Sequence, residues 1–278
     1  MQAAAGTPRP DFLYGTAWKE DRTAALTSLA LRMGFRGIDT ANQRRHYVEA
    51  AVGQGLAAAY DDGIVTRDDL FLQTKFTYLN GQDHRLPYDP AADLSTQVAQ
   101  SLASSLEHLG TDHVESFVLH GPASGSAWTD DDSEVWSAMQ KERDAGRTRW
   151  LGVSNVSQRH LQQMAAVGAE LPAFVQNRCF ARVGWDRAVR AFCRERGIIY
   201  QGFSLLTANQ QVLRDPLVAA IAARTGATSA QVVFRFSLDV GMLPLTGTTD
   251  PDHMRQDLDS RSVQLSPDEV RMIETLGE

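Results

Sequence analysis

The stretch LSTQVAQSLASSLEHLGTDHVESFVL, residues 94–119, contains one complete step from a helix to a strand. Its apolar residues recur at helical spacing, at Leu94, Val98, Leu102, Leu106 and Leu109. Gly110 then supplies a helix stop signal. The apolar run VESFVL, residues 114–119, follows and suits a buried strand. The segment therefore predicts a helix followed by a buried strand, which is the repeating unit of parallel α/β folds.

The same alternation extends in both directions along the chain. Short apolar runs suited to strands occupy residues 12–16, 35–39, 70–75, 114–119, 149–154, 174–177, 198–203 and 242–246. Helical patterns cover residues 21–33, 47–60, 94–109, 131–145, 157–166, 186–196, 216–224, 229–239 and 266–276. No repeat or low-complexity linker divides the sequence. Eight strands alternating with helices predict one α/β domain, a (β/α)8 barrel, over residues 1–278.

Composition excludes several classes of protein. Hydrophobic residues make up 43% of the 278 residues, so wholesale disorder is excluded. The net charge of −7 argues against a nucleic-acid or membrane-surface binder, and no apolar run approaches a membrane span. The first ten residues lack a secretory signal pattern. Cys179 and Cys193 are interpreted as two thiols in a reducing cytosol, without a metal site. We expect a cytoplasmic monomer, with a homo-oligomer as the alternative.

Polar side chains stand at nearly every predicted strand end. They are Asp39, Lys75, His120, Ser154, Asn155, Gln176, Asn177, Phe203 with Ser204, and Thr246 with Gly247 and Thr248. In a (β/α)8 barrel all these ends lie on one face, where catalytic groups are found. Some of them could serve only as caps of the following helices. The pattern nevertheless favours an enzyme over a structural barrel.

Seven segments resemble the aldo-keto reductase family in order and spacing, from about residue 12 to 276. They are GTAWK (15–19), GFRGIDTA (34–41), LFLQTK (70–75), FVLHGP (117–122), GVSN (152–155), VQN (175–177) and AQVVFRF (230–236). The resemblance implies a (β/α)8 barrel that binds NADPH, or NADH, and reduces an aldehyde or ketone without a metal. The chain stops soon after residue 276, so the resemblance also implies a short C-terminal tail and an open, permissive substrate pocket.

The resemblance implies four catalytic groups, an Asp, a Tyr, a Lys and a His. Three of them are Asp39, Lys75 and His120. The family pattern would place the Tyr at Arg44, but a two-residue insertion would bring Tyr47 to the site. Arg44 or His46 at that spot, or an impaired site, are the alternatives. Under this hypothesis Tyr47 donates a proton, Lys75 lowers the pKa of its phenol, Asp39 holds Lys75, and His120 orients the carbonyl.

The resemblance also implies how the cofactor is held. Ser154, Asn155 and Gln176 would bind the carboxamide, and Phe203 would stack on the nicotinamide. Further cofactor contacts are expected from Gly15, Thr16, Ala17, Asp39, Ser204, Leu206, Gly247, Thr248, Thr249, His253, Arg255 and Asp257. The usual basic residues for a 2′-phosphate are absent, and Arg255 is the nearby substitute, so NADPH is expected and NADH remains possible.

Substrate contacts are expected from Trp18, Tyr78 and Trp128, together with Tyr47 and His120. Trp18 could instead be a core residue. Two other functions stay open at this point. One is a non-catalytic barrel that binds a nucleotide or a protein partner. The other is a cofactor-independent isomerase or dehydratase that uses the same pocket.

Overall fold

Eight parallel strands close into a barrel, each paired with the next along the chain and β8 paired with β1. The strands are β1 Leu13–Gly15, β2 Gly37–Asp39, β3 Phe71–Phe76, β4 Val114–Leu119, β5 Thr148–Ser154, β6 Phe174–Arg178, β7 Ile199–Phe203 and β8 Met242–Thr246. The computed structural model describes residues 10–277, so residues 1–9, on which the expectation about a secretory signal depends, lie outside it. The predicted (β/α)8 barrel is confirmed.

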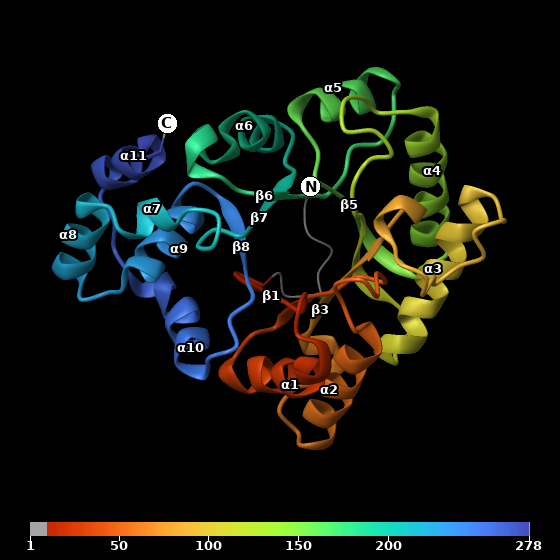
Figure 1. The fold of residues 1–278 in the computed structure, drawn as a ribbon, viewed down its shortest axis with the longest axis horizontal. Helices are drawn as coiled ribbons and strands as arrows, with labels where there is room; N and C mark the ends of the chain where they lie inside the picture. Colours follow the sequence, from red (N-terminus) through yellow and green to blue (C-terminus); the bar gives the residue numbers. More distant parts are fainter. Residues whose placement is uncertain (1–9, 278) are drawn as a thin grey trace.

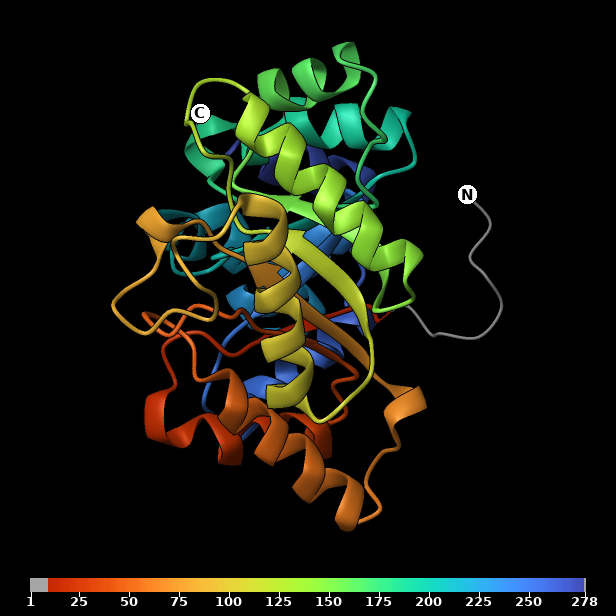
Figure 2. The same ribbon diagram turned by 90° about the vertical axis from the view of Figure 1, so that its right-hand side faces the viewer.

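Helices surround the barrel (Figure 1). They are α1 Thr23–Met33, α2 Glu49–Asp61, α3 Leu94–Leu109, α4 Asp130–Asp144, α5 Gln158–Ala166, α6 Arg187–Glu195, α7 Gln210–Leu213, α8 Pro216–Thr225, α9 Ser229–Asp239, α10 Pro251–Asp259 and α11 Pro267–Thr275. Figure 2 shows α3 and α4 along one flank, where they pack together. Within residues 10–277, no single helix has the length and apolar composition to cross a membrane; only the bent pair α8 and α9 meets that test jointly.

Local sequence signals explain several helix ends. The Asp93 side chain accepts a hydrogen bond from the Thr96 amide at the start of α3, and Gly110 ends that helix in the left-handed conformation at φ 65°. The helix predicted over residues 21–33 begins two residues later than expected. Asp21 lies inside a 3₁₀ turn, Glu20–Arg22, and α1 begins only at Thr23.

The barrel interior is built in layers because every second strand residue points inward. Its lower layer is apolar and contains Leu13, Phe71, Phe174 and Leu243. Two residues further along their strands, the inward positions become polar, at Gln73 after Phe71 and Gln176 after Phe174. Asp39 and Gln201 join this polar layer from β2 and β7. Apolar side chains therefore close the lower end of the barrel, and polar side chains line the interior above them.

Candidate functional site

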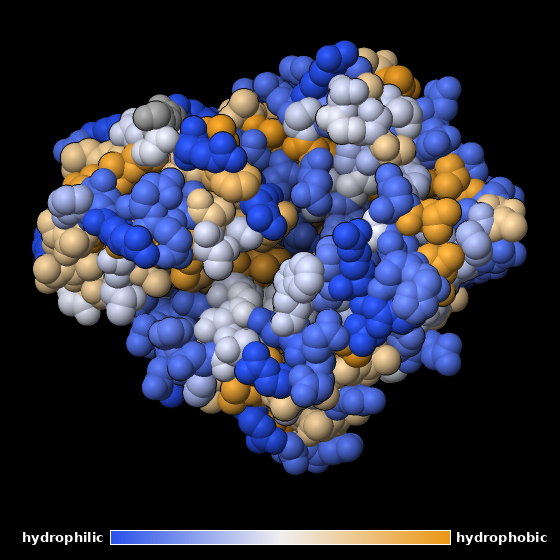
Figure 3. All heavy atoms as spheres, in the orientation of Figure 1, coloured by the Kyte–Doolittle hydropathy of each residue, from blue (hydrophilic) through white to orange (hydrophobic). Residues whose placement is uncertain are grey.

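A cavity of about 770 Å³ lies above the polar layer, at the carboxyl ends of the strands. Figure 3 shows a hollow near the centre of this face with hydrophilic residues around much of it. Most of the residues predicted for the site line the cavity: Gly15, Ala17, Trp18, Asp39, Tyr47, His120, Ser154, Asn155, Gln176, Phe203, Ser204, Leu206, Gly247, Thr248, His253 and Asp257. This volume is in the range of small-molecule sites.

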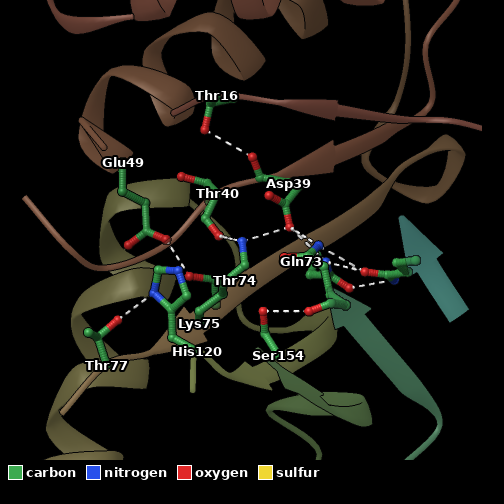
Figure 4. A network of polar contacts seen from close by, with 12 residues as sticks. Thr16, Asp39, Thr40, Glu49, Gln73, Thr74, Lys75, Thr77, His120 and Ser154 are labelled. Carbon is green, nitrogen blue, oxygen red and sulfur yellow. Dashed lines mark hydrogen bonds and ion pairs between the residues drawn. The ribbon is translucent and has the colours of Figure 1, made fainter. Parts of the chain in front are cut away.

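Asp39 and Lys75 form a buried ion pair below the cavity. Both residues are nearly inaccessible, and the Lys75 Nζ atom donates to Asp39 Oδ1 at 2.7 Å and to the Thr40 carbonyl at 2.7 Å (Figure 4). Burial lowers the pKa of Lys75, and the Asp39 carboxylate opposes that effect. Asp39 therefore does not cap a helix; it holds a buried ammonium at a fixed point under the cavity.

Tyr47 lies beside that ammonium. Residues 44–46 form a turn, and Tyr47 follows it before α2 begins at Glu49, two residues later than predicted. The Lys75 Nζ atom is 5.3 Å from the centroid of the Tyr47 ring. The ring centroids of Tyr47 and His120 are 6.0 Å apart. Three of the four predicted catalytic side chains, Asp39, Tyr47 and His120, thus line the cavity. The fourth, Lys75, lies beside Tyr47 and pairs with Asp39.

The two alternative residues for the acid differ in their positions relative to the cavity. The Arg44 guanidinium pairs with Glu20 at 3.3 Å, and Arg44 does not border the cavity. His46 does border it, but its ring packs on Trp18 with centroids 4.1 Å apart. Trp18 is 68% exposed, so it lies at the mouth of the cavity and is not a core tryptophan.

The pKa of Tyr47 is shifted in the direction opposite to the one expected. We expected Lys75 to lower this pKa. Burial instead raises the pKa of the Tyr47 phenol, and the Asp39 carboxylate raises it further. Without a bound ligand Tyr47 therefore keeps its proton at neutral pH, which is the state that a proton donor needs.

His120 is held in its neutral form. Its Nδ1 atom is 2.7 Å from the Thr77 hydroxyl, so Nε2 is the ring nitrogen that can form a hydrogen bond with a bound molecule. Burial lowers the pKa of His120 to about 3, and the charges of Lys75 and His46 contribute. A neutral imidazole can donate a hydrogen bond to an oxygen, but it is not a strong acid at neutral pH.

Three cavity residues that are not glycine have left-handed backbone conformations. They are Trp18 at φ 62°, Asn155 at φ 56° and Ser204 at φ 57°. Such conformations cost on the order of 1–3 kcal/mol each and gather at functional sites. Asn155 is held there because its Nδ2 atom donates to the His120 carbonyl at 2.7 Å. The three residues follow β1, β5 and β7, and all three border the cavity.

Six predicted residues do not line the cavity, and one of them is Lys75, which lies under it in the pair with Asp39. Thr16 is buried and donates to the Asp39 carbonyl, and Thr249 is exposed. Arg255 is exposed and pairs with Asp252, so it adds no charge to the cavity. The Tyr78 hydroxyl donates to Asp132 at 3.0 Å, and the Trp128 indole donates to Ser133 at 3.1 Å. The local bonds of Tyr78 and Trp128 turn both rings away from the expected substrate pocket.

Lys19 is a candidate cofactor residue that the sequence analysis missed. It is only 7% exposed, lines the cavity, and its Nζ atom donates to the Gly247 carbonyl. Burial lowers its pKa. The sequence did contain a signal for this role, because Lys19 is the last residue of the GTAWK segment, residues 15–19. Its ammonium contacts Gly247, in the segment after β8 that was expected to bind phosphate.

We expect Lys19→Met to weaken NADPH binding by about 10- to 100-fold, since a hydrogen bond to a charged group is worth roughly 1.5–3 kcal/mol. Titration of the protein fluorescence with NADPH measures the Kd. Lys141→Met, which removes an exposed lysine on α4, is the matched control and should leave the Kd unchanged. Equal affinities of the Lys19 and Lys141 variants would contradict the assignment.

Asp257 is a buried carboxyl in the cavity wall, 4% exposed, and accepts one hydrogen bond from the Thr246 hydroxyl at 2.7 Å. Burial raises its pKa from 3.8 to about 6, while Thr246 and His253 act in the opposite direction. The folded protein holds this proton more tightly than the unfolded chain does. Stability is therefore lost as the pH rises through that interval.

We expect Asp257→Asn to raise the free energy of unfolding by on the order of 2 kcal/mol at pH 8 and to change it little near pH 4. The amide keeps an acceptor for Thr246 and cannot ionise. Urea denaturation at both pH values measures the difference. Asp259→Asn, an exposed position on the same helix, is the control. A gain that is equal at both pH values would show that the carboxyl does not titrate as described.

Comparisons with known proteins identify the family of this chain. Residues 6–278 match the model of the Aldo/keto reductase family. An aldo-keto reductase of Mycolicibacterium vanbaalenii is 33% identical over 250 residues, covering 90% of this chain and 81% of that protein. The structure of a Bombyx mori aldo-keto reductase, AKR2E4, in complex with NADP superimposes with a TM-score of 0.80 at 25% identity, covering 98% and 93% of the two chains. The fold is also that of an aldo/keto reductase from Brucella melitensis, with a TM-score of 0.81 at 24% identity and coverage of 96% and 95%. The chain therefore belongs to the aldo/keto reductase family, whose members are NAD(P)H-dependent oxidoreductases.

Proposed function

We propose that the protein uses NADPH to reduce the carbonyl group of an aldehyde or ketone to an alcohol, with Tyr47 as the proton donor. The observation that supports this most directly is that Asp39, Tyr47 and His120 line a single cavity. The Lys75 ammonium lies just behind them, paired with Asp39 and 5.3 Å from the centroid of the Tyr47 ring. The residues expected at the nicotinamide, from β5, β6 and β7, lie on the same cavity.

The donor set of the cavity fits a nicotinamide nucleotide. Gln176 has an amide oxygen for a carboxamide N–H, and Phe203 has an aromatic ring for stacking. Gly247 and Lys19 place backbone groups and a positive charge where a pyrophosphate would bind. Because Arg255 does not reach the cavity, the choice of NADPH over NADH rests on the relative solved with NADP.

The proposed chemistry divides the work between the cofactor and the chain. When bound, the reduced nicotinamide supplies the hydride. The Tyr47 hydroxyl donates its proton to the carbonyl oxygen as negative charge develops there, and His120 hydrogen-bonds that oxygen. The phenolate left on Tyr47 is stabilised by the Lys75 ammonium 5.3 Å from its ring, which Asp39 and the Thr40 carbonyl hold in place.

Loss of absorbance at 340 nm tests this proposal, with NADPH or NADH and a panel of aldehydes and ketones. We expect turnover with at least one carbonyl compound and quenching of protein fluorescence by NADPH. Binding of NADPH without turnover across the panel would favour a non-catalytic nucleotide-binding barrel. Conversion of a substrate without any nucleotide would favour the isomerase or dehydratase alternative.

A further inference from the structure

Three buried glutamines, Gln73, Gln176 and Gln201, lie directly beneath the cavity in the polar layer of the barrel. Their exposures are 0%, 3% and 0%. A glutamine amide has two donor hydrogens on one atom and an acceptor oxygen on the other, so its orientation decides what it offers to a ligand. None of the catalytic roles above uses Gln73 or Gln201.

Asp39 decides the orientation of two of these amides. A carboxylate only accepts hydrogen bonds. Gln73 Nε2 lies 2.7 Å from Asp39 Oδ1, and Gln176 Nε2 lies 3.0 Å from the same oxygen. Lys75 is the third donor to that oxygen, at 2.7 Å. Both glutamines must therefore turn their NH₂ groups toward Asp39, because the opposite orientation would place amide oxygens against a carboxylate oxygen.

Gln201 then uses the remaining hydrogens. Its Oε1 atom accepts from Gln73 Nε2 and from Gln176 Nε2, both at 2.9 Å. Its Nε2 atom donates to Gln73 Oε1 at 2.9 Å. Both hydrogens of the Gln176 amide are thus engaged below the cavity. The Gln176 oxygen is the group that remains for a molecule in the cavity, which Gln176 lines.

We propose that Gln201, with Gln73, is a positioning residue that locks the Gln176 amide with its oxygen toward the cavity, so that the site accepts a hydrogen bond from the carboxamide of the nicotinamide. This inference rests on the proposed function and extends it from the residues that touch the cofactor to those that orient them. Gln201 itself does not border the cavity; it acts through Gln176.

The physical reason for a polar layer at this depth supports the assignment. An amide buried in a barrel interior costs free energy unless its hydrogen bonds are made, and apolar residues would fill the same space. In the bonds among Asp39 and these three glutamines, every amide nitrogen and oxygen takes part except the oxygen of Gln176. These bonds restrict each amide to one orientation.

The first variant is Gln201→Met, which keeps the length of the side chain and removes its hydrogen bonds. We expect the Kd for NADPH to rise about tenfold, since the loss is worth about one hydrogen bond. The Kd for adenosine 2′,5′-bisphosphate, which lacks the nicotinamide, should stay within about twofold of the wild type. Fluorescence titration measures both. Gln97→Met, at a buried glutamine of α3 that donates to the Ala92 carbonyl, is the matched control and should change neither Kd.

The second variant is Gln201→Glu, which keeps the size of the side chain nearly constant and tests the orientation of the amide groups. A neutral carboxyl group donates and accepts as the amide does, whereas an ionised one only accepts and adds a negative charge beside Asp39. The charged groups in this network are Asp39 from β2 and Lys75 from β3. At pH 5.5 we expect the variant and the wild type to have nearly the same Kd for NADPH. At pH 8 the ratio of the variant's Kd to the wild-type Kd should be about ten or more.

The outcomes separate this inference from the proposed function. A wild-type protein that does not bind NADPH overturns the proposed function and this inference with it. If the wild type binds NADPH but Gln201→Met weakens both nucleotides equally, or neither, the positioning role is overturned alone. If Gln201→Met fails to fold in a thermal melt, the Gln201→Glu ratio decides, and a ratio that does not change with pH overturns the role.

Discussion

Replacing Tyr47 by phenylalanine is expected to lower kcat by about 10²–10⁴-fold, the usual contribution of general acid catalysis. The change removes one hydroxyl and almost no packing volume, because the ring itself stays beside Lys75 and His120. The Kd for NADPH should barely change. Steady-state kinetics at saturating NADPH, with the fluorescence titration beside it, measure the two effects separately.

Two neighbours of Tyr47 are the controls. Arg44→Ala should be mild, because Arg44 pairs with Glu20 outside the cavity. His46→Ala removes the ring that packs on Trp18, so it should affect KM more than kcat. A Tyr47→Phe enzyme with near-normal turnover, next to an inactive Arg44→Ala or His46→Ala enzyme, would move the proton donor to that other residue.

Replacing Lys75 by methionine is expected to reduce kcat by a comparable factor, about 10²–10⁴-fold. The ammonium lies 5.3 Å from the Tyr47 ring, so it is the positive charge that stabilises the phenolate left after proton transfer. Because the two groups act as a unit, the double variant with Tyr47→Phe should be little worse than either single variant. Losses that multiply in the double variant would show that Lys75 and Tyr47 act independently.

Lys75→Met also breaks a buried ion pair, which typically costs about 3–5 kcal/mol. Here Asp39 keeps hydrogen bonds from Gln73 and Gln176, which should make the loss of stability smaller. Kinetics should therefore be measured at a temperature where a thermal melt shows the variant folded. A folded Lys75→Met enzyme with wild-type kcat would make the Asp39–Lys75 pair structural rather than catalytic.

Much of the architecture could be predicted from the sequence because it depends on local patterns. Helical spacing of leucines and a glycine stop predicted α3, and the structure places its end at Gly110. Short apolar runs between such helices predicted all eight strands, since buried parallel strands are apolar on both faces. Strand ends then indicated Asp39, Lys75 and His120, because the fold brings those ends to one face.

Other features depended on contacts between distant segments. The sequence left Arg44, His46 and Tyr47 as alternatives; the turn at residues 44–46 and the ion pair of Arg44 with Glu20 leave Tyr47 beside Lys75. Sequence position also suggested Tyr78 and Trp128 as pocket residues, yet their bonds to α4 turn them away. A loop side chain takes its direction from whichever partner it meets in space, and spacing along the chain does not contain that information.

For the buried glutamines of the polar layer too, the sequence predicts the position within each strand, whereas the tertiary structure decides the bonding partners. The sequence shows Gln73 and Gln201 in the middle of apolar runs, and alternation along β3 and β7 turns them inward. Nothing local reveals that Gln73 bonds to Asp39, that Gln201 bonds to Gln176, or that the two glutamines bond to each other across the barrel. Hydrogen bonds reach only about 3 Å, so the orientation of each amide is decided by partners that only the closed barrel brings together.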